Sequence, residues 1–85
     1  MKTTFILLAQ YEIAVIPVEV VCRDYFQHLT PANFARKSLT GDIPIPVIQI
    51  EDSQKATRGV HVADLAKWID DRRAAAVKEI AKVLG

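Results

Sequence analysis

The spacing of hydrophobic positions changes twice in the first part of the chain. Residues 3–11 form a nearly continuous apolar run, which fits either a short helix or a buried strand, and we favour the helix. Residues 12–16 end just before a proline, a position that favours extended backbone, and predict a short strand that could pair with a later hairpin. From Pro17 onward, apolar residues at helical spacing predict a second helix. These residues are Val18, Val21, Cys22, Tyr25 and Phe26.

A third helix has clear signals at both ends. Thr30 can accept a hydrogen bond from a free backbone N–H at a helix start, and Pro31 suits the first helical position. Gly41 can adopt the left-handed conformation that ends a helix, and Pro44 prevents continuation. The helix is therefore short, and three of its apolar residues are expected to face inward. These are Phe34, Ala35 and Leu39.

A helix-turn-helix followed by a β-hairpin is predicted in the middle of the chain. The link between the second and third helices is only a few residues long, so the two helices must cross steeply, giving a helix-turn-helix over residues 17–40. Residues 43–50 are β-branched and extended, and their two prolines place the first part of this segment at a sheet edge. A polar loop at 51–59 and a further strand pattern complete a hairpin over residues 45–62.

A long helix is predicted for residues 63–84, because this segment has no glycine or proline and is rich in alanine. Leu65, Trp68 and Ile69 are expected to close the core at its start. Phe26 lies on the apolar stripe of the second helix, so we expect it to be a core residue as well.

The second half of this helix carries more apolar surface than one small core needs. We predict that this stripe joins two copies of the chain. Its residues are Ala76, Val77, Ile80, Val83 and Leu84. The alternative is that the stripe folds back over Phe5 and Leu8 and completes the core of a single copy.

The length and hydrophobic content indicate one small domain spanning residues 1–85, and the predicted helices and strands make it α+β. A net charge of +1 gives no global argument for nucleic-acid binding, so any such argument depends on where Arg and Lys lie. Cys22 is the only cysteine, which excludes an internal disulfide and fits a reducing cytoplasm. The apolar run at 5–9 is too short to span a membrane.

The polar face of the third helix and the tip of the hairpin are the candidate DNA contacts. On the helix these are Thr30, Asn33, Arg36, Lys37 and Thr40, and on the hairpin they are Ser53, Gln54, Lys55 and Arg58. Asparagine can pair with adenine and arginine with guanine in the major groove, so Asn33 and Arg36 are expected to read bases. The hairpin residues are expected to hold the DNA backbone or minor groove. The alternative for both sets is a merely solvated surface.

No arrangement of residues typical of catalysis is visible. The sequence has no Ser/His/Asp grouping, no paired-carboxylate spacing, no phosphate-binding loop and no metal motif. His28, His61 and Cys22 are each interpreted as structural. We therefore expect neither an enzyme nor a cofactor or metal.

The order of elements resembles the excisionase-like and MerR-like winged-helix domains, through Gly41-Asp42-Ile43-Pro44 and Asp64-Leu65-Ala66-Lys67-Trp68. Several longer phrases resemble the pyocin activator (PrtN-like) family over essentially the full length. These are Thr3-Thr4-Phe5, Ala9-Gln10-Tyr11, Ile16-Pro17, Val21-Cys22-Arg23-Asp24-Tyr25-Phe26, His28-Leu29-Thr30-Pro31, Gly41-Asp42-Ile43-Pro44, Ser53-Gln54-Lys55 and Gly59-Val60-His61. The turn after Tyr11, which often carries glycine in that family, here reads Glu12-Ile13-Ala14.

The resemblance implies a small bacterial transcriptional activator associated with prophages or phage-tail-like bacteriocin clusters. Its expected partners are double-stranded promoter DNA, a second copy of the chain and RNA polymerase. Two alternatives use the same fold. One is a protein-interaction module, such as an anti-repressor or polymerase adaptor, which the low net charge favours, and the other is an excisionase-like architectural DNA-binding protein.

Overall fold

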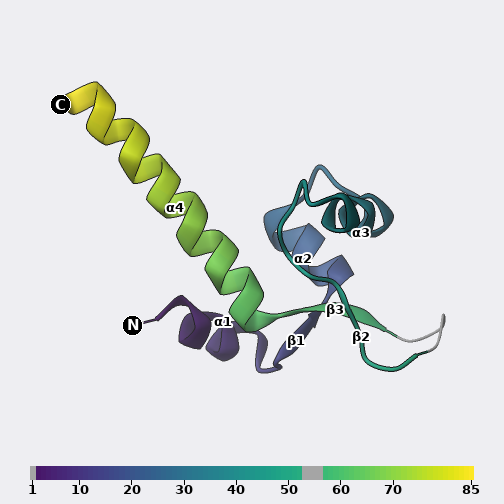
Figure 1. The fold of residues 1–85 in the computed structure, drawn as a ribbon. Helices are drawn as coiled ribbons and strands as arrows, with labels where there is room; N and C mark the ends of the chain where they lie inside the picture. The colour runs from purple at the N-terminus through teal and green to yellow at the C-terminus, as the bar shows by residue number, and fades with distance from the viewer. Residues whose placement is uncertain (1, 53–56) are drawn as a thin grey trace.

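The computed structural model describes residues 2–52 and 57–85, and over these residues the chain is an α+β fold of four helices and a three-stranded antiparallel sheet (Figure 1). A long C-terminal helix follows the sheet, as in a small winged helix-turn-helix domain. The elements are α1 (Thr3–Tyr11), β1 (Val15–Pro17), α2 (Val18–Tyr25), α3 (Pro31–Thr40), β2 (Ile48–Gln49), β3 (Arg58–His61) and α4 (Val62–Leu84).

The sheet has the order β1-β3-β2, so β3 is its central strand. Ile16 lies opposite Val60 in the β1–β3 pair, and Ile48 lies opposite Gly59 in the β2–β3 pair. The predicted pairing of the early strand with the hairpin is therefore confirmed. Glycine at 59 is required by this pairing, because a Cβ there would lie 2.5 Å from the Val15 Cγ1 atom and 2.8 Å from the Ile16 carbonyl oxygen.

The hairpin is shorter than the predicted span of 45–62. Its paired part consists of β2 and β3 alone, because proline at 44 and 46 cannot donate to a ladder. Val62 begins α4 instead of ending the strand. The second helix begins one residue later than predicted, because Pro17 ends β1 and α2 begins at Val18. The predicted helix at residues 3–11 is confirmed by α1.

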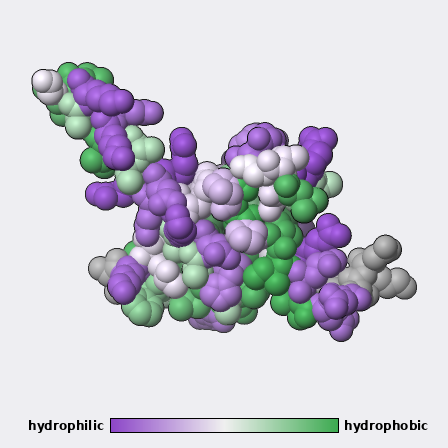
Figure 2. Space-filling view, in the orientation of Figure 1, coloured by the Kyte–Doolittle hydropathy of each residue, from purple (hydrophilic) through white to green (hydrophobic). Residues whose placement is uncertain are grey.

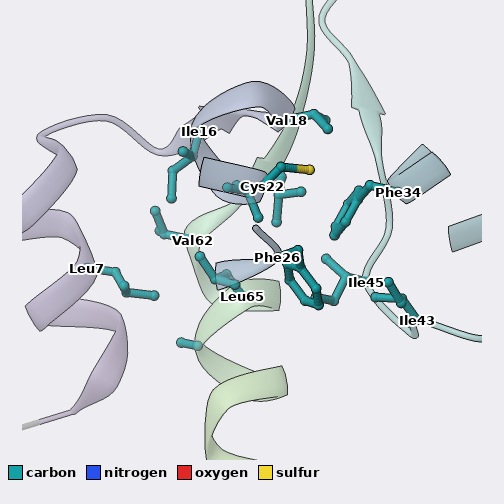
Figure 3. Packing of buried hydrophobic residues seen from close by; sticks show 13 residues of the cluster. Leu7, Ile16, Val18, Cys22, Phe26, Phe34, Ile43, Ile45, Val62 and Leu65 are labelled. Atoms are coloured by element: carbon teal, nitrogen blue, oxygen red, sulfur yellow. The ribbon is translucent and has the colours of Figure 1, made fainter. Parts of the chain in front are cut away.

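The core lies where α2, α3, the sheet and the start of α4 meet (Figure 3). Phe26 is buried, with its ring centroid 5.0 Å from that of Phe34 and 4.8 Å from that of Trp68. Trp68 and Ile69 are partly buried against this cluster, and Leu65 is fully buried. The sequence therefore placed Phe26 and the first turns of the last helix correctly in the core.

The second half of α4 extends away from the rest of the molecule, whose principal extents are 52 × 29 × 19 Å (Figure 1). Helix α1 packs against the first half of α4, where the Thr3 hydroxyl donates to Asp70 Oδ1 at 2.6 Å. Ile80 is 54% exposed and Leu84 is 80% exposed. The alternative in which the apolar stripe folds back over the N-terminal segment is therefore wrong for a single chain.

A polar clamp joins α1 to α2. The Tyr11 hydroxyl donates to Asp24 Oδ2 at 2.5 Å, and Arg23 Nε donates to Asp24 Oδ1 at 2.9 Å. The Arg23 guanidinium first, and the Tyr11 hydroxyl second, lower the pKa of the Asp24 carboxyl below its usual value. Burial and the Asp24 carboxylate raise the pKa of Tyr11, so its hydroxyl stays protonated and keeps donating.

The clamp predicts a loss of stability in acid. Because the folded pKa of Asp24 is depressed, its contribution is present above the unfolded pKa of about 4 and disappears as pH falls through the folded value. Asp24→Asn should therefore flatten the decline of the unfolding free energy below about pH 4, as followed by urea titrations at several pH values. Tyr11→Phe removes one of the two partners and should give an intermediate profile. Identical acid profiles for wild type and Asp24→Asn would contradict this role.

The turn after α1 contains a non-glycine residue in the left-handed conformation. Glu12 has φ 59°, and its backbone N–H donates to the Leu8 carbonyl oxygen at 2.8 Å, which ends the helix. A side chain in this conformation costs about 1–2 kcal/mol, which glycine avoids, although glycine loses more chain entropy on folding. Glu12→Gly should therefore raise stability by up to about 1 kcal/mol in urea titrations, whereas Glu12→Ala keeps the Cβ and should not. A lower midpoint for Glu12→Gly would show that the turn does not need this conformation.

Candidate nucleic-acid interface

Helix α3 is fixed at both ends and along its inner face. The Thr30 hydroxyl accepts from the Asn33 backbone N–H at 3.2 Å, and Gly41 has φ 81°, so the predicted cap and stop signals are both confirmed. Phe34 is fully buried and anchors the inner face. One turn later, the Ser38 hydroxyl donates to the Ile45 carbonyl oxygen at 2.6 Å and ties α3 to the segment that leads into the sheet.

The outer face of α3 differs from the predicted one. The exposed residues of the helix are Pro31, Ala32, Arg36, Leu39 and Thr40, whereas Asn33 and Lys37 are half-buried on one flank. The prediction that Leu39 faces inward is wrong, because its side chain is 89% exposed. With Phe34 pointing inward, a residue five positions later lies about 140° around the helix and must point outward.

Lys37 and Thr40 have neighbours within the protein. Lys37 borders a hollow of ≈ 570 Å³ between the end of α2, the end of α3 and α4, with Trp68 and Asp71 among its other lining residues. Thr40 Oγ1 lies 3.2 Å from both the Lys37 carbonyl oxygen and Asp42 Oδ2, so its hydroxyl already has two acceptors within the protein. Arg36 remains the exposed charged side chain of this helix.

A groove of ≈ 670 Å³ separates α3 from the sheet. Ala35, Ser38 and Leu39 line it on the helix side, and Gln49 and Arg58 line it on the strand side. The segment between α3 and β2 also lines it, through Pro44, Ile45, Pro46 and Val47. The fold thus brings Arg58 to the same groove as the outer face of α3, while the predicted contacts Ser53, Gln54 and Lys55 lie outside the described residues.

Arg36 and Arg58 are both exposed, and within residues 2–52 and 57–85 neither forms an ion pair. The ion pairs in that part of the chain join Arg23 to Asp24 and Lys67 to Asp71, which lie on α2 and α4. Arg58 lines the groove, and Arg36 is exposed on the helix that forms its other side. Two exposed guanidinium groups without carboxylate partners in the described residues favour an anionic partner.

His61 and Cys22 both occupy structural positions in the fold. His61 Nδ1 accepts from the Ala63 backbone N–H at 3.0 Å and caps α4. Cys22 is buried, and burial raises the pKa of its thiol, which disfavours the reactive thiolate. In the described part of the chain, no three His, Cys, Asp or Glu side chains are placed to hold a metal ion, and no helix there is long and apolar enough to cross a membrane.

A family model for the pyocin activator protein PrtN matches residues 3–76, which include every described element up to the middle of α4. The chain belongs to the pyocin activator family. Comparison with curated proteins and with solved structures gave no match. The pyocin activator family is a regulatory family and not a class of enzymes, and its match confirms the resemblance seen in the sequence.

Sequence reasoning overlooked two features of the site in this pyocin activator. Leu39 was assigned to the core because it is apolar and follows Phe34 by nearly one and a half turns, although the helical angle from Phe34 alone places it outside. The closeness of Arg58 to α3 depends on β3 being the central strand, and no local signal in the sequence shows the strand order.

Proposed function

We propose that this pyocin activator family member is a sequence-specific DNA-binding activator of transcription for bacteriocin (pyocin-like) or prophage genes. In this proposal α3 enters the major groove of promoter DNA and the β2–β3 hairpin contacts the DNA backbone. The observation that carries it is a pair of exposed arginines in a regulatory protein, Arg36 on α3 and Arg58 on β3, neither of which forms an ion pair within residues 2–52 and 57–85. Arg58 lines the groove next to α3.

The two arginines have different roles in this arrangement. Arg36 is on the outer face of α3 and is the side chain we expect to read a guanine by two parallel hydrogen bonds. Arg58 begins β3 at the edge of the groove and is expected to contact phosphate. Asn33 at the flank of α3 is proposed as a supporting contact to bases, and Lys55, which follows β2 in the sequence, as a supporting contact to the backbone.

We further propose that the protein acts as a homodimer joined through the second half of α4. One short helix and one hairpin form an interface near the small end for specific DNA binding, and two units on a repeated site increase the affinity. The second half of α4 projects beyond α1 (Figure 1), and the stripe suited to this contact is exposed in a single chain. It comprises Ala76, Val77, Ile80, Val83 and Leu84.

Substitution of the two arginines should separate base reading from backbone binding. Arg36→Ala should cost about 1–3 kcal/mol of binding free energy on the cognate site and relax the preference at one base pair. Arg58→Ala should weaken binding to all sequences similarly and lower the slope of log affinity against log salt by about one unit. Lys2→Ala, the same change in charge before α1, is the control. Unchanged binding by both arginine variants would remove these residues from the interface.

Activation itself is tested with a reporter gene placed behind the promoter of the operon next to the gene for this protein. Wild type and Lys2→Ala should switch on the reporter, whereas Arg36→Ala should not. Immunoblotting confirms equal protein levels. If Arg36→Ala activates as well as wild type, activation does not depend on base reading by α3, and the proposal fails.

A further inference from the structure

Leu39 is the most exposed of the large hydrophobic residues in the described part of the chain, at 89%. It shares the outer face of α3 with Ala32, which is exposed, and Ala35, which is half-buried. The helix face that would meet DNA under the proposed function is thus mainly apolar, with Arg36 as its one charged residue. Ala32 and Leu39 stay in contact with water and therefore contribute little to folding.

The groove beside this face is also lined mainly by apolar residues. Pro44, Pro46 and Val47 line it together with Leu39, and hydrophobic surface runs between the helices and the sheet in the view of Figure 2. The hydroxyl of Ser38, one of its few polar groups, is already used by the Ile45 carbonyl oxygen. The partner of this surface must therefore offer apolar groups close to negative charge.

Duplex DNA has this combination in its major groove. The C5-methyl of thymine is the apolar group on the base edges there, and small or aliphatic side chains contact it, while the phosphates on either side attract cations. Arg36 precedes Leu39 by three positions on α3, and Arg58 lines the same groove as Leu39. Neither arginine has an ion-pair partner in residues 2–52 and 57–85. An apolar protein segment would leave both guanidinium groups without an anionic partner.

We propose that Leu39, with Ala32 and Ala35 beside it, contacts thymine methyl groups next to the base read by Arg36, and that thymine at those positions is part of the recognition site. This inference rests on the proposed function. It assigns to Leu39 a specificity role in place of the core role predicted from the sequence.

The test uses a duplex selected from random-sequence DNA by the wild-type protein. Each thymine is replaced in turn by deoxyuridine, which lacks only the C5-methyl, and affinity is measured by fluorescence anisotropy. At one or two positions the wild type should lose about three- to tenfold in affinity, as expected for one buried methyl group. Leu39→Ala should bind the thymine and deoxyuridine duplexes equally at those positions. Ile13→Ala, an exposed apolar residue in the turn after α1, is the control and should keep the wild-type sensitivity.

The outcomes separate this inference from the proposed function. If the wild type selects no duplex, both fail together. If the wild type binds but is insensitive to deoxyuridine at every position, or if Leu39→Ala retains the wild-type sensitivity, the thymine contact is overturned while DNA binding stands. If Leu39→Ala loses reporter activation with unchanged thymine sensitivity, the surface meets a protein and the inference is also overturned. Because Leu39 is exposed, its alanine variant should melt like wild type.

Discussion

Phe26→Ala is expected to cost about 3–5 kcal/mol of unfolding free energy, which is most of the stability of so small a domain. Phe26 is buried between Phe34 and Trp68, with ring centroids 5.0 and 4.8 Å away, so its removal leaves a cavity where α2, α3 and α4 meet. The fluorescence of Trp68, the only tryptophan, reports the same cluster directly during urea unfolding.

Two further variants provide comparisons for the loss of stability in Phe26→Ala. Trp68→Ala should fall at the lower end of the same range, because Trp68 is only partly buried against the core. Its unfolding is followed by circular dichroism, since the fluorophore is absent. Leu39→Ala removes a similarly apolar side chain from an exposed position and should change the midpoint little. A Phe26→Ala protein with the wild-type midpoint would contradict the packing described above.

Ile80→Asp is expected to leave a folded monomer that binds promoter DNA at least about 100-fold more weakly than wild type. The side chain is 54% exposed in a single chain, so a carboxylate there costs little in folding, but it would be buried in the centre of a helix pair. Losing the second DNA-binding unit removes the gain in affinity that two linked contacts give on a repeated site.

Analytical ultracentrifugation and DNA titration of the same samples provide the measurement. Lys78→Asp introduces an acid at a neighbouring position outside the apolar stripe and is the matched control, which should remain a dimer. Wild type that sediments as a monomer at tens of micromolar, both free and on DNA, would rule out the dimer. Unfolding of Ile80→Asp would instead show that the stripe is needed inside one chain.

The elements with strong local signals were predictable from the sequence. Thr30, Pro31 and Gly41 define the two ends of α3, and the alanine-rich segment without glycine or proline defines α4 almost to the residue. The burial of Phe26 and Leu65 followed from helical spacing. These features depend on neighbours a few positions away, so a single sequence contains the necessary information.

Features that depend on distant parts of the chain were predictable only in part, because the early strand was expected to pair with the hairpin but the sequence does not show which strand of the hairpin it joins. The central position of β3 follows from its pairing with β1 more than forty positions earlier, and this pairing brings Arg58 to the groove beside α3. The phase of α3 was misjudged because Leu39 was treated as a core residue, although only Phe34 reaches the core from that helix as a fully buried side chain. The candidate site changed accordingly, from a fully polar helix face to one in which a single arginine lies among apolar residues.

The central claim is direct recognition of duplex DNA, and a titration of labelled duplex with the purified wild-type protein tests it most simply. Fluorescence anisotropy compares the DNA upstream of the neighbouring operon with a shuffled duplex of the same composition at several salt concentrations. We predict at least 100-fold tighter binding to the promoter duplex, and an affinity that falls steeply as salt increases. Equal affinity for the two duplexes, or no binding to either at low salt, would contradict the account and favour a regulator that acts through protein contacts alone.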